Sequence, residues 1–308
     1  MAVGCRPVIS SAGPDDADRA ATLIQLVRED RVVTAAGVRY QLMTTPPEDR
    51  MAFWRAEAGG ELIGWAFGGL DAFAPVRTAG FASVIVHPRH RRRGIGSELW
   101  APLSEHLDAI GARRIVSHSD GDDDTRAFAA ARGYRLEGTH STLALDPRSL
   151  PPPPEPPAGV ELVPMSRFAD DPEPVYVADS LSAQDEPGPS DFSGMTFETW
   201  RRYIWDYPDN DRELSLAALV GGSVVGTTFL YSDRGSGRAA NSGTGVIREY
   251  RGRGLGLLMK QHSLTRAAAA GITRVTTQND ETNGPMLAIN AHLGYEPFAV
   301  GHAWVLER

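Results

Sequence analysis

An internal repeat limits the possible folds of this chain more than any other feature. Three short sequence patterns each occur twice, and the two copies of each are separated by nearly the same number of residues. The offsets between the copies are 162, 160 and 161 residues, so they agree within two residues over roughly seventy positions. A unit this long is too large for a solenoid repeat. The 308-residue chain is therefore predicted to hold one duplicated domain rather than two unrelated ones. The matched patterns are Ile63-Gly64-Trp65 with Val225-Gly226-Thr227, Arg91–Gly96 with Arg251–Gly256, and Arg132-Gly133-Tyr134 with Leu293-Gly294-Tyr295.

A proline-rich segment separates the two copies. Six of the seven residues from Pro151 to Pro157 are proline, which excludes helix and central strand and favours a stiff polyproline spacer. We therefore predict an N-terminal domain over residues 1–149, a linker over 150–158 and a C-terminal domain over 159–308.

Both copies show the same order of expected elements. A short strand and one or more helices precede a β-hairpin that turns at Gly-Gly. A strand then runs through an arginine- and glycine-rich loop into a helix, and a further strand, a helix and a closing pair of strands complete the unit. This order predicts an α+β fold with a mixed, mostly antiparallel sheet flanked by helices. The expected ranges are 8–11, 14–28, 52–58, 62–69, 80–86, 96–110, 114–118 and 125–132, then 160–164, 174–183, 197–205, 214–220, 224–231, 243–247, 256–270, 274–278 and 286–292.

The arginine- and glycine-rich loop is the most informative motif. A strand that feeds a helix through small residues points several backbone N–H groups at one place, where the helix dipole adds positive potential. Glycine lets the main chain approach an anion closely, and arginines add charge-assisted hydrogen bonds. The loops at Arg91–Gly96 and Arg251–Gly256 therefore predict diphosphate sites. The alternative is a glycine loop that only turns the chain.

Two nucleotide-binding motifs are excluded. Neither loop has the Gly-x-x-x-x-Gly-Lys-Ser/Thr pattern of a P-loop. The last glycine of a dinucleotide fingerprint is also missing, because Leu99 or Met259 stands there when counting starts at Gly94 or Gly254.

In this strand-to-helix setting both loops resemble the acetyl-CoA signature of the GNAT superfamily of acyl-CoA-dependent N-acetyltransferases, Arg/Gln-x-x-Gly-x-Gly/Ala. Residues 128–134 and 283–295 resemble the family's second motif. The resemblance covers nearly the whole chain, with one copy in each half, as in the tandem mycothiol synthases.

The resemblance implies a mechanism. The loop amides would hold the CoA diphosphate, and the preceding strand, splayed from its neighbour by a β-bulge, would pair with the pantetheine arm. A strand N–H, that of Val246, would polarise the thioester carbonyl, and an amine would attack directly in a ternary complex. The implied cofactor is acetyl-CoA or another short acyl-CoA. The implied cofactor-binding residues are Val84, Ile85, Val86, Arg91, Arg92, Arg93, Gly94, Ile95 and Gly96 in the first half, and Gly245, Val246, Ile247, Arg251, Gly252, Arg253, Gly254, Leu255, Gly256 and Asn283 in the second.

The chain departs from the family at one position. Many members carry a tyrosine four residues before the glycine of the second motif, where it protonates the departing thiolate. Here Ala129 and Asn290 stand at that position. We expect the second half to be catalytic, with Asn290 and, more weakly, Asp233 as candidate catalytic residues. The first half's acidic turn, residues 119–124, is expected to be a solvated helix cap.

The acceptor is predicted to be an amine of a small molecule. Residues 185–213 hold eight acidic side chains against three arginines, a net charge of −5 that favours a cationic amine. Four aromatic residues in this region could wall a pocket for the amine or pack in the core. They are Trp200, Tyr203, Trp205 and Tyr207.

Composition limits the remaining function classes. With a net charge of −8 the chain is a poor candidate for binding nucleic acid, and it has no apolar run long enough to span a membrane. The N-terminus does not resemble a secretory signal, so we expect a cytoplasmic protein. The single cysteine, Cys5, and the histidine spacing predict no metal site. Two alternatives to a small-molecule acetyltransferase remain: a non-catalytic acyl-CoA sensor and a protein N-acetyltransferase.

Overall fold

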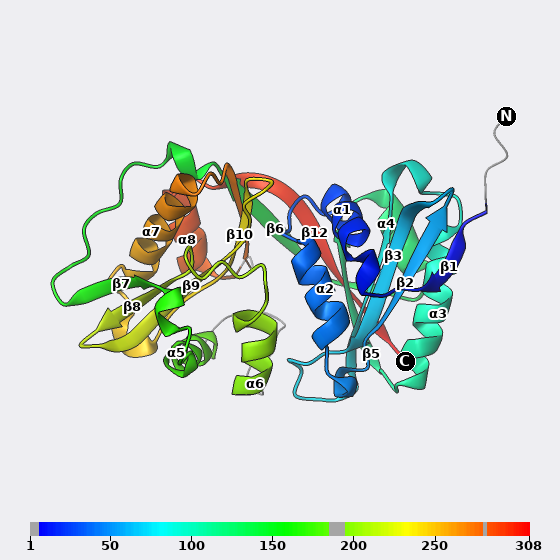
Figure 1. Ribbon diagram of the computed structural model, residues 1–308, viewed down its shortest axis with the longest axis horizontal. Coiled ribbons are helices and arrows are strands. Elements are labelled where there is room, and N and C mark those ends of the chain that lie inside the picture. The colour runs from blue at the N-terminus through cyan, green and yellow to red at the C-terminus, as the bar shows by residue number, and fades with distance from the viewer. Residues whose placement is uncertain (1–5, 185–194, 280–281) are drawn as a thin grey trace. The chain divides into compact units, whose positions relative to one another are not determined.

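The computed structural model describes residues 6–184, 195–279 and 282–308. The chain forms two compact units (Figure 1). The first unit holds residues 1–29, 33–139 and 300–308, and the second holds residues 30–32 and 140–299. Among the described residues, no helix combines the length and the apolar composition that crossing a membrane requires.

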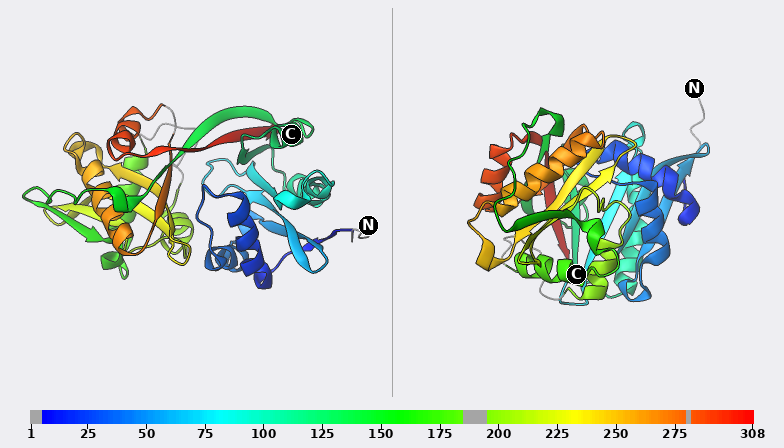
Figure 2. Two further views of the ribbon diagram at one scale, coloured as in Figure 1. Left: turned by 90° about the horizontal axis from the view of Figure 1, so that it is seen from above. Right: turned by 60° about the vertical axis from the view of Figure 1, so that its left-hand side comes forward.

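The first unit contains a sheet of order β1-β2-β3-β4-β5-β12. Its pairings are antiparallel except for the parallel pair β4–β5. Helices α1 and α2 cover one face and α3 the other (Figure 2). The elements are β1 (Val8–Ser11), α1 (Ala17–Val27), α2 (Ala35–Thr44), β2 (Ala52–Ala58), β3 (Glu61–Leu70), β4 (Ala79–Val86), α3 (Ile95–Ala109), β5 (Arg114–Asp120), α4 (Asp123–Ala130) and the end of β12 (Glu296–Glu307).

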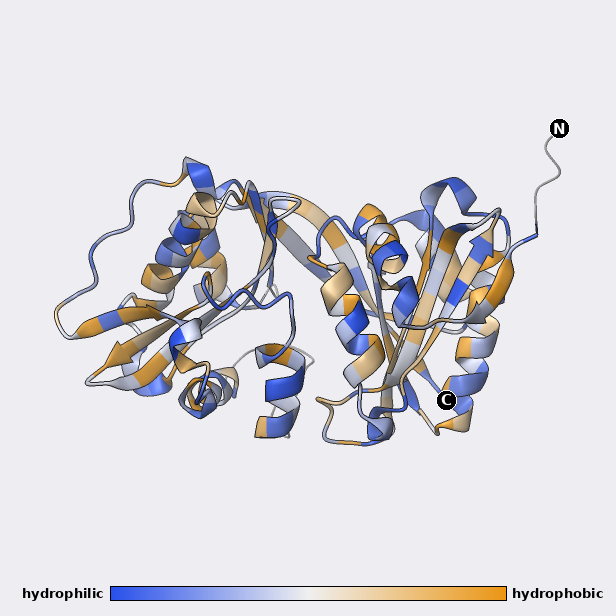
Figure 3. Ribbon diagram, in the orientation of Figure 1, coloured by the Kyte–Doolittle hydropathy of each residue, from blue (hydrophilic) through white to orange (hydrophobic). Residues whose placement is uncertain are grey.

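Two apolar clusters hold this sheet between its helices. On α3, Leu99, Leu103 and Leu107 recur every four residues and are completely buried against β3 and β4. On the other face, Trp65 and Ile85 pack against α1. The hydropathy colouring of Figure 3 shows the resulting pattern, with hydrophobic bands on helices that also carry hydrophilic ones.

The second unit contains a sheet of order β6-β11-β10-β9-β8-β7, in which only β10 and β11 run parallel. Its elements are β6 (Arg135–Leu145), β7 (Val160–Pro164), α5 (Glu173–Ala183), α6 (Phe197–Trp200) with a π-helical turn over Arg201–Trp205, β8 (Leu216–Val220), β9 (Ser223–Asp233), β10 (Arg238–Val246), α7 (Leu255–Ala269), β11 (Arg274–Asn279) and α8 (Gly284–His292).

The α+β fold class is confirmed, and both Gly-Gly hairpins form, since Gly59, Gly60, Gly221 and Gly222 all have positive φ. Two expectations were wrong. Helix α2 was not predicted, and each expected closing pair of strands is one long strand, β6 or β12.

The long strands also link the two repeats. Residues 141–145 of β6 pair with β11 in the second unit, whereas residues 301–307 of β12 pair with β5 in the first unit. The last strand of each repeat therefore contributes its final residues to the sheet of the other repeat. The compact units therefore differ from the ranges 1–149 and 159–308. Residues 30–32, residues 140–149 and the linker residues 150–158 belong to the second unit, and residues 300–308 belong to the first.

Candidate active site

In the first unit, strand β4 separates from its parallel neighbour. The β4–β5 ladder runs from the pair Ala79–Arg114 to the pair Phe81–Val116. Strand β4 then continues for five residues to Val86, still paired on its other side with β3. The β4 edge beyond Phe81 therefore has no β5 ladder partner, and it can pair with an extended ligand, apart from the carbonyls of Ala82 and Val86, which accept hydrogen bonds from Ser117 Oγ and Arg91 Nε.

The loop after β4 forms a cluster of backbone donors at the start of α3. Arg92 (φ 62°) and Gly94 (φ 86°) both have left-handed backbone conformations, and Gly94 is the N-cap of the helix. The first N–H groups bonded back to the Gly94 carbonyl are those of Ser97 and Glu98, at 2.9 and 3.0 Å. The N–H groups of Ile95 and Gly96 precede these bonds, so they can bind an anion.

A cleft of about 410 Å³ joins the strand edge to this loop. Four arginines and two aspartates line it, so its lining has an excess of positive charge that suits a ligand with several phosphates. These residues are Arg28, Arg91, Arg92, Arg132, Asp120 and Asp124. Eight of the nine cofactor residues expected in the first half line this cleft, whereas Arg93 is not part of the lining. The eight are Val84, Ile85, Val86, Arg91, Arg92, Gly94, Ile95 and Gly96.

One wall of the cleft is formed by α4. Arg132 lies over the ring of Phe128, 3.4 Å from its centroid, and donates a hydrogen bond of 2.7 Å to Ser97 Oγ. Burial lowers the pKa of Arg132. A Cβ on Gly96 would stand 2.9 Å from Phe128 Cε2, so only glycine fits without movement where α3 meets α4.

The second unit repeats the strand and the loop. The β10–β11 ladder extends from the pair Arg238–Arg274 to the pair Asn241–Thr277, and β10 continues to Val246. A bulge between Asn241 and Gly243 interrupts the pairing of β10 with β9. The family resemblance implied such a bulge, whereas the β3–β4 pairing of the first unit is continuous.

The diphosphate loop of the second unit also starts a helix. Gly252 (φ 72°) and Gly254 (φ 76°) have left-handed backbone conformations, and Gly254 is the N-cap of α7. Beside the loop, Arg251 Nε donates to the Val246 carbonyl at 2.8 Å. A Cβ on Gly245 would stand 2.1 Å from Ser182 Oγ, so this glycine allows α5 to approach β10 closely.

Asn290 and Asp233, the two candidate catalytic residues of the second half, both form hydrogen bonds within the protein. Asn290 is completely buried, and its Oδ1 accepts a hydrogen bond of 2.6 Å from Lys260 Nζ. Burial lowers the pKa of Lys260 to about 7. Asp233 accepts hydrogen bonds from the N–H groups of Gly235 and Ser236, which places it in the turn after β9.

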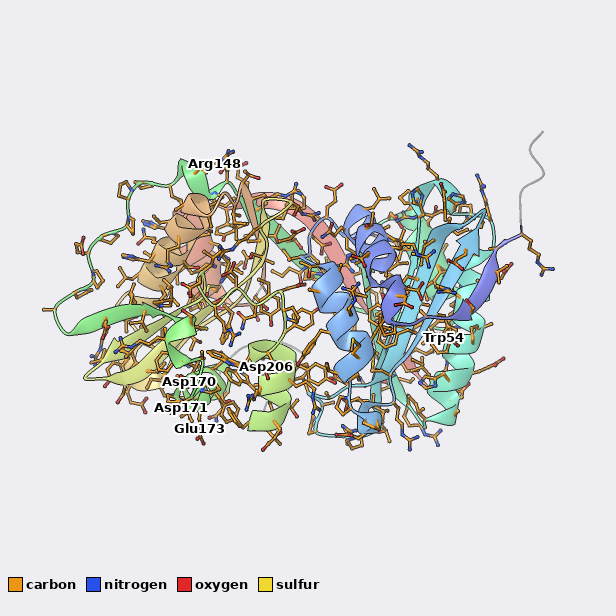
Figure 4. All side chains as sticks on the ribbon, in the orientation of Figure 1. Trp54, Arg148, Asp170, Asp171, Glu173 and Asp206 are labelled. Carbon is orange, nitrogen blue, oxygen red and sulfur yellow. The ribbon has the colours of Figure 1, made fainter. Side chains whose placement is uncertain are left out.

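The acidic and aromatic region after α5 is partly core. Trp200 and Trp205 are 0% and 1% exposed, and Trp200 Nε1 donates to Asp179 Oδ2 at 2.8 Å. These two tryptophans therefore pack in the core, which was one of the two alternatives for them. Tyr207 stacks on Tyr231. Asp185, Glu186 and Asp191 lie outside the described residues. Figure 4 shows further carboxylates, Asp170, Asp171 and Glu173, gathered at the start of α5, and Asp206 beside α6.

Sequence reasoning missed several residues of the cleft. Arg28 comes from the end of α1, His118 and Asp120 come from β5, and Asp124 comes from the acidic turn. That turn was expected to cap a helix, and Asp122 does accept a hydrogen bond of 2.7 Å from the Thr125 N–H. The sequence does have an aspartate at every second position here, at Asp120, Asp122 and Asp124, which could have indicated ion pairs. Their arginine partners are 30 or more residues away in the sequence.

Known proteins share these sequence elements. The model of the acetyltransferase (GNAT) family matches residues 22–134 and 181–295, so each match contains one strand, loop and helix unit. A mycothiol acetyltransferase of Saccharomonospora viridis is 29% identical over 260 residues, which cover 81% of each chain. A mycothiol acetyltransferase of a Nocardioides species is 26% identical over 239 residues, 71% of this chain and 80% of that protein.

Solved structures show the same fold. A tandem GNAT protein from the clavulanic acid biosynthesis pathway is similar with a TM-score of 0.75 at 24% identity and covers 98% of both chains. A GCN5-related N-acetyltransferase from Sphaerobacter thermophilus has a TM-score of 0.69 at 21% identity, over 98% of this chain and 96% of that one. The duplicated strand and loop and the two family matches lead to one conclusion: this chain is an acetyltransferase with tandem domains and belongs to the GNAT family.

Proposed function

We propose that this acetyltransferase transfers the acetyl group of acetyl-CoA to an amine of a small molecule in a ternary complex. The observation that carries the proposal is the strand edge that runs to a glycine-rich helix start in both units. In the first unit it opens into a cleft of about 410 Å³ lined by four arginines. This combination fits a ligand with an amide-rich arm and several phosphates. Val84–Val86 would pair with the arm, and the loop over Arg91–Gly96 would bind the diphosphate.

In the second unit the corresponding cofactor residues are Gly245–Ile247 and Arg251–Gly256. Asn283 is also a candidate on the cofactor side. Its side chain accepts a hydrogen bond of 3.2 Å from the Met286 N–H, so it is fixed as the cap of α8. When acetyl-CoA is bound, its thioester would supply the electrophile. The amine nitrogen forms the new C–N bond and loses one proton, the C–S bond breaks, and CoA leaves as the thiolate that takes up a proton to become the free thiol.

The second unit is the better candidate for the transfer step because its acceptor-side face is polar. Trp65 follows Gly64 in β3 and belongs to an apolar cluster. Thr227 follows Gly226 at the equivalent position of β9, and its hydroxyl donates to Asp179 Oδ1 at 3.2 Å. Thr227 is completely buried and supports the partly exposed Asp179 carboxylate, which can bind a polar acceptor, whereas an apolar cluster cannot.

A cationic amine is the acceptor class that the charges of this face favour. Burial and the carboxylates of Asp179 and Asp209 raise the pKa of Tyr231, so the region has a negative potential. An ammonium group is stabilised by such a potential and by nearby aromatic rings. The names of the two mycothiol acetyltransferase relatives support a small-molecule acceptor.

Paired glycine variants test both the activity and the half that performs it. Gly94→Val and Gly254→Val each place a β-branched side chain at a positive φ at the start of a helix. Thiol release from acetyl-CoA is followed with a panel of a diamine, an aminosugar and an amino acid. We expect turnover in the wild type and in Gly94→Val, and its loss in Gly254→Val. Equal loss in both variants would contradict transfer in the second unit, and CoA binding without turnover for every amine would favour a sensor.

A further inference from the structure

Three arginine–aspartate pairs lie at the cleft of the first unit. Arg91 Nη1 lies 3.3 Å from Asp122 Oδ2, and Arg92 Nη1 lies 3.4 Å from Asp124 Oδ1. A third pair joins Arg28 Nε to Asp120 Oδ1 at 3.6 Å. Arg91 and Arg92 belong to the loop proposed to bind the diphosphate, so two of the cations that this ligand needs already bind carboxylates.

The aspartates are held in place by the start of α4. Asp122 is the N-cap of this helix, with its Oδ1 on the Thr125 N–H, while its Oδ2 faces Arg91. Asp124 lies in the first helical turn and lines the cleft. The Asp122 carboxylate is therefore held at the cleft by its cap hydrogen bond, and the short side chain of Asp124 lies beside Arg92 in the first turn of the same helix.

The second unit differs at the same loop. Gly252 occupies the position that corresponds to Arg92, so one of the two paired arginines has no counterpart there. Arg251, which corresponds to Arg91, donates to the Val246 carbonyl at 2.8 Å, as Arg91 does to the Val86 carbonyl at 3.3 Å, and also to the Ser182 carbonyl at 3.4 Å. Within the described ranges, the arrangement of two neighbouring arginines paired with two aspartates is found at the loop of the first unit.

We infer that Asp122 and Asp124 set the affinity of the first cleft for acyl-CoA by competing with its diphosphate for Arg91 and Arg92. Two negatively charged groups cannot share these arginines without repulsion, so binding of the diphosphate requires the carboxylates to give up the cations or to bear the added charge. This inference rests on the proposed function, because it requires acyl-CoA to bind in the first cleft.

Titration calorimetry with CoA on the full-length chain tests the inference. The variants are Asp122→Asn, Asp124→Asn and the double variant, and asparagine at 122 keeps the helix cap. The matched control is Asp123→Asn, which removes the same charge from the same turn at a residue outside the three pairs. Each titration is repeated with Gly254→Val, which disables the second loop and isolates binding to the first cleft.

We expect each single variant to bind CoA about 1.4-fold to 5-fold more tightly, the range that exposed ion pairs correspond to. The double variant should bind about 2-fold to 25-fold more tightly, and Asp123→Asn should stay within about 1.5-fold of the wild type. The gain should shrink as salt is raised, because the pairs are screened. Equal tightening by Asp123→Asn would overturn the inference, since the effect would then be one of net charge.

Two further probes identify the competing group. Dephospho-CoA keeps the diphosphate, so the gain should persist with it, and loss of the gain would contradict competition for the diphosphate. Pantetheine lacks every phosphate, so its binding should not change, and a tighter pantetheine complex would likewise contradict it. Unchanged CoA affinity in the double variant would overturn the inference but leave the proposed function standing. No CoA binding to the first cleft in any protein would also overturn the inference, whereas the absence of thiol release from the wild type with every amine would count against the proposed function.

Discussion

Lys260, the single lysine of the chain, gives the second unit a stability that should depend strongly on pH. Its side chain is 1% exposed on α7, donates to Asn290 Oδ1 at 2.6 Å and lies 5.2 Å from the ring centroid of Tyr295. Burial lowers its pKa from an ordinary 10.5 to about 7. The perturbation that tests this is Lys260→Met, which keeps the length and volume of the side chain and removes the amine.

The magnitude follows from linkage. Between pH 7 and 10.5 the unfolded chain holds one more proton at this residue than the folded chain, so folding stability falls as the pH is lowered through this window. The slope is about 1.4 kcal/mol per pH unit, and the cost at pH 7 is about 4 kcal/mol. Methionine removes this cost but leaves Asn290 Oδ1 without its donor, which costs about 1–3 kcal/mol. Lys260→Met should therefore be more stable than the wild type at pH 7 and less stable at pH 10.

Urea unfolding of both proteins at pH 7, 8 and 9.5 measures the difference directly. The matched control is Arg266→Met, which removes an exposed cation from the same helix. We expect the stability difference between Lys260→Met and the wild type to shrink by about 3 kcal/mol from pH 7 to 9.5, and the control to change little over this range. If the free energies of unfolding of Lys260→Met and the wild type changed with pH in parallel, folding would not lower the pKa of Lys260.

Two further matched pairs test the first unit and the helix starts. Gly96→Ala puts a Cβ 2.9 Å from Phe128, so it should lower the free energy of unfolding by about 1–3 kcal/mol and weaken CoA binding. The Cβ of Gly256→Ala meets its nearest atom at 3.6 Å, so this variant should be as stable as the wild type or more stable in thermal unfolding. Equal effects would contradict the close packing at Gly96. Asp16 is 1% exposed and binds two arginines, so Asp16→Ala should cost about 3 kcal/mol in urea unfolding, while Asp18→Ala removes an exposed pair and should cost less than about 1 kcal/mol. A small loss at Asp16 would show that its ion pairs do not stabilise the unit.

Local patterns were sufficient to predict most of the elements. The Gly-Gly turns predicted both hairpins, and the expected helix over 96–110 is α3 over Ile95–Ala109. Helix α2 was missed because Gly37 interrupts a weak apolar pattern. A signal was available in Thr34, whose hydroxyl accepts the Gly37 N–H at 3.0 Å as an N-cap.

Long-range pairing was beyond the sequence patterns. A closing pair of strands was expected at the end of each repeat, where the structure has the single strands β6 and β12. Each remains one strand because its end pairs with a strand of the other repeat, β11 or β5. No local propensity encodes that exchange, since it depends on contacts between distant segments.

The candidate site shows the same difference between features that a local pattern predicts and contacts that depend on the fold. The loop glycines and the strand edge were predicted by residue number from a local motif. The partners of the loop arginines were not, because Asp122 and Asp124 come from a different element and meet the loop only in the folded unit. Asn290 was proposed from the family's motif position, whereas its contact with Lys260 depends on the packing of α7 against α8.

The most direct test of the central claim is a crystal structure of the full chain with acetyl-CoA at saturating concentration. We expect density for the diphosphate at the N–H groups around Gly94 and Ile95, with the pantetheine arm along Val84–Val86 of β4. A first cleft that holds no ligand under these conditions would contradict that claim.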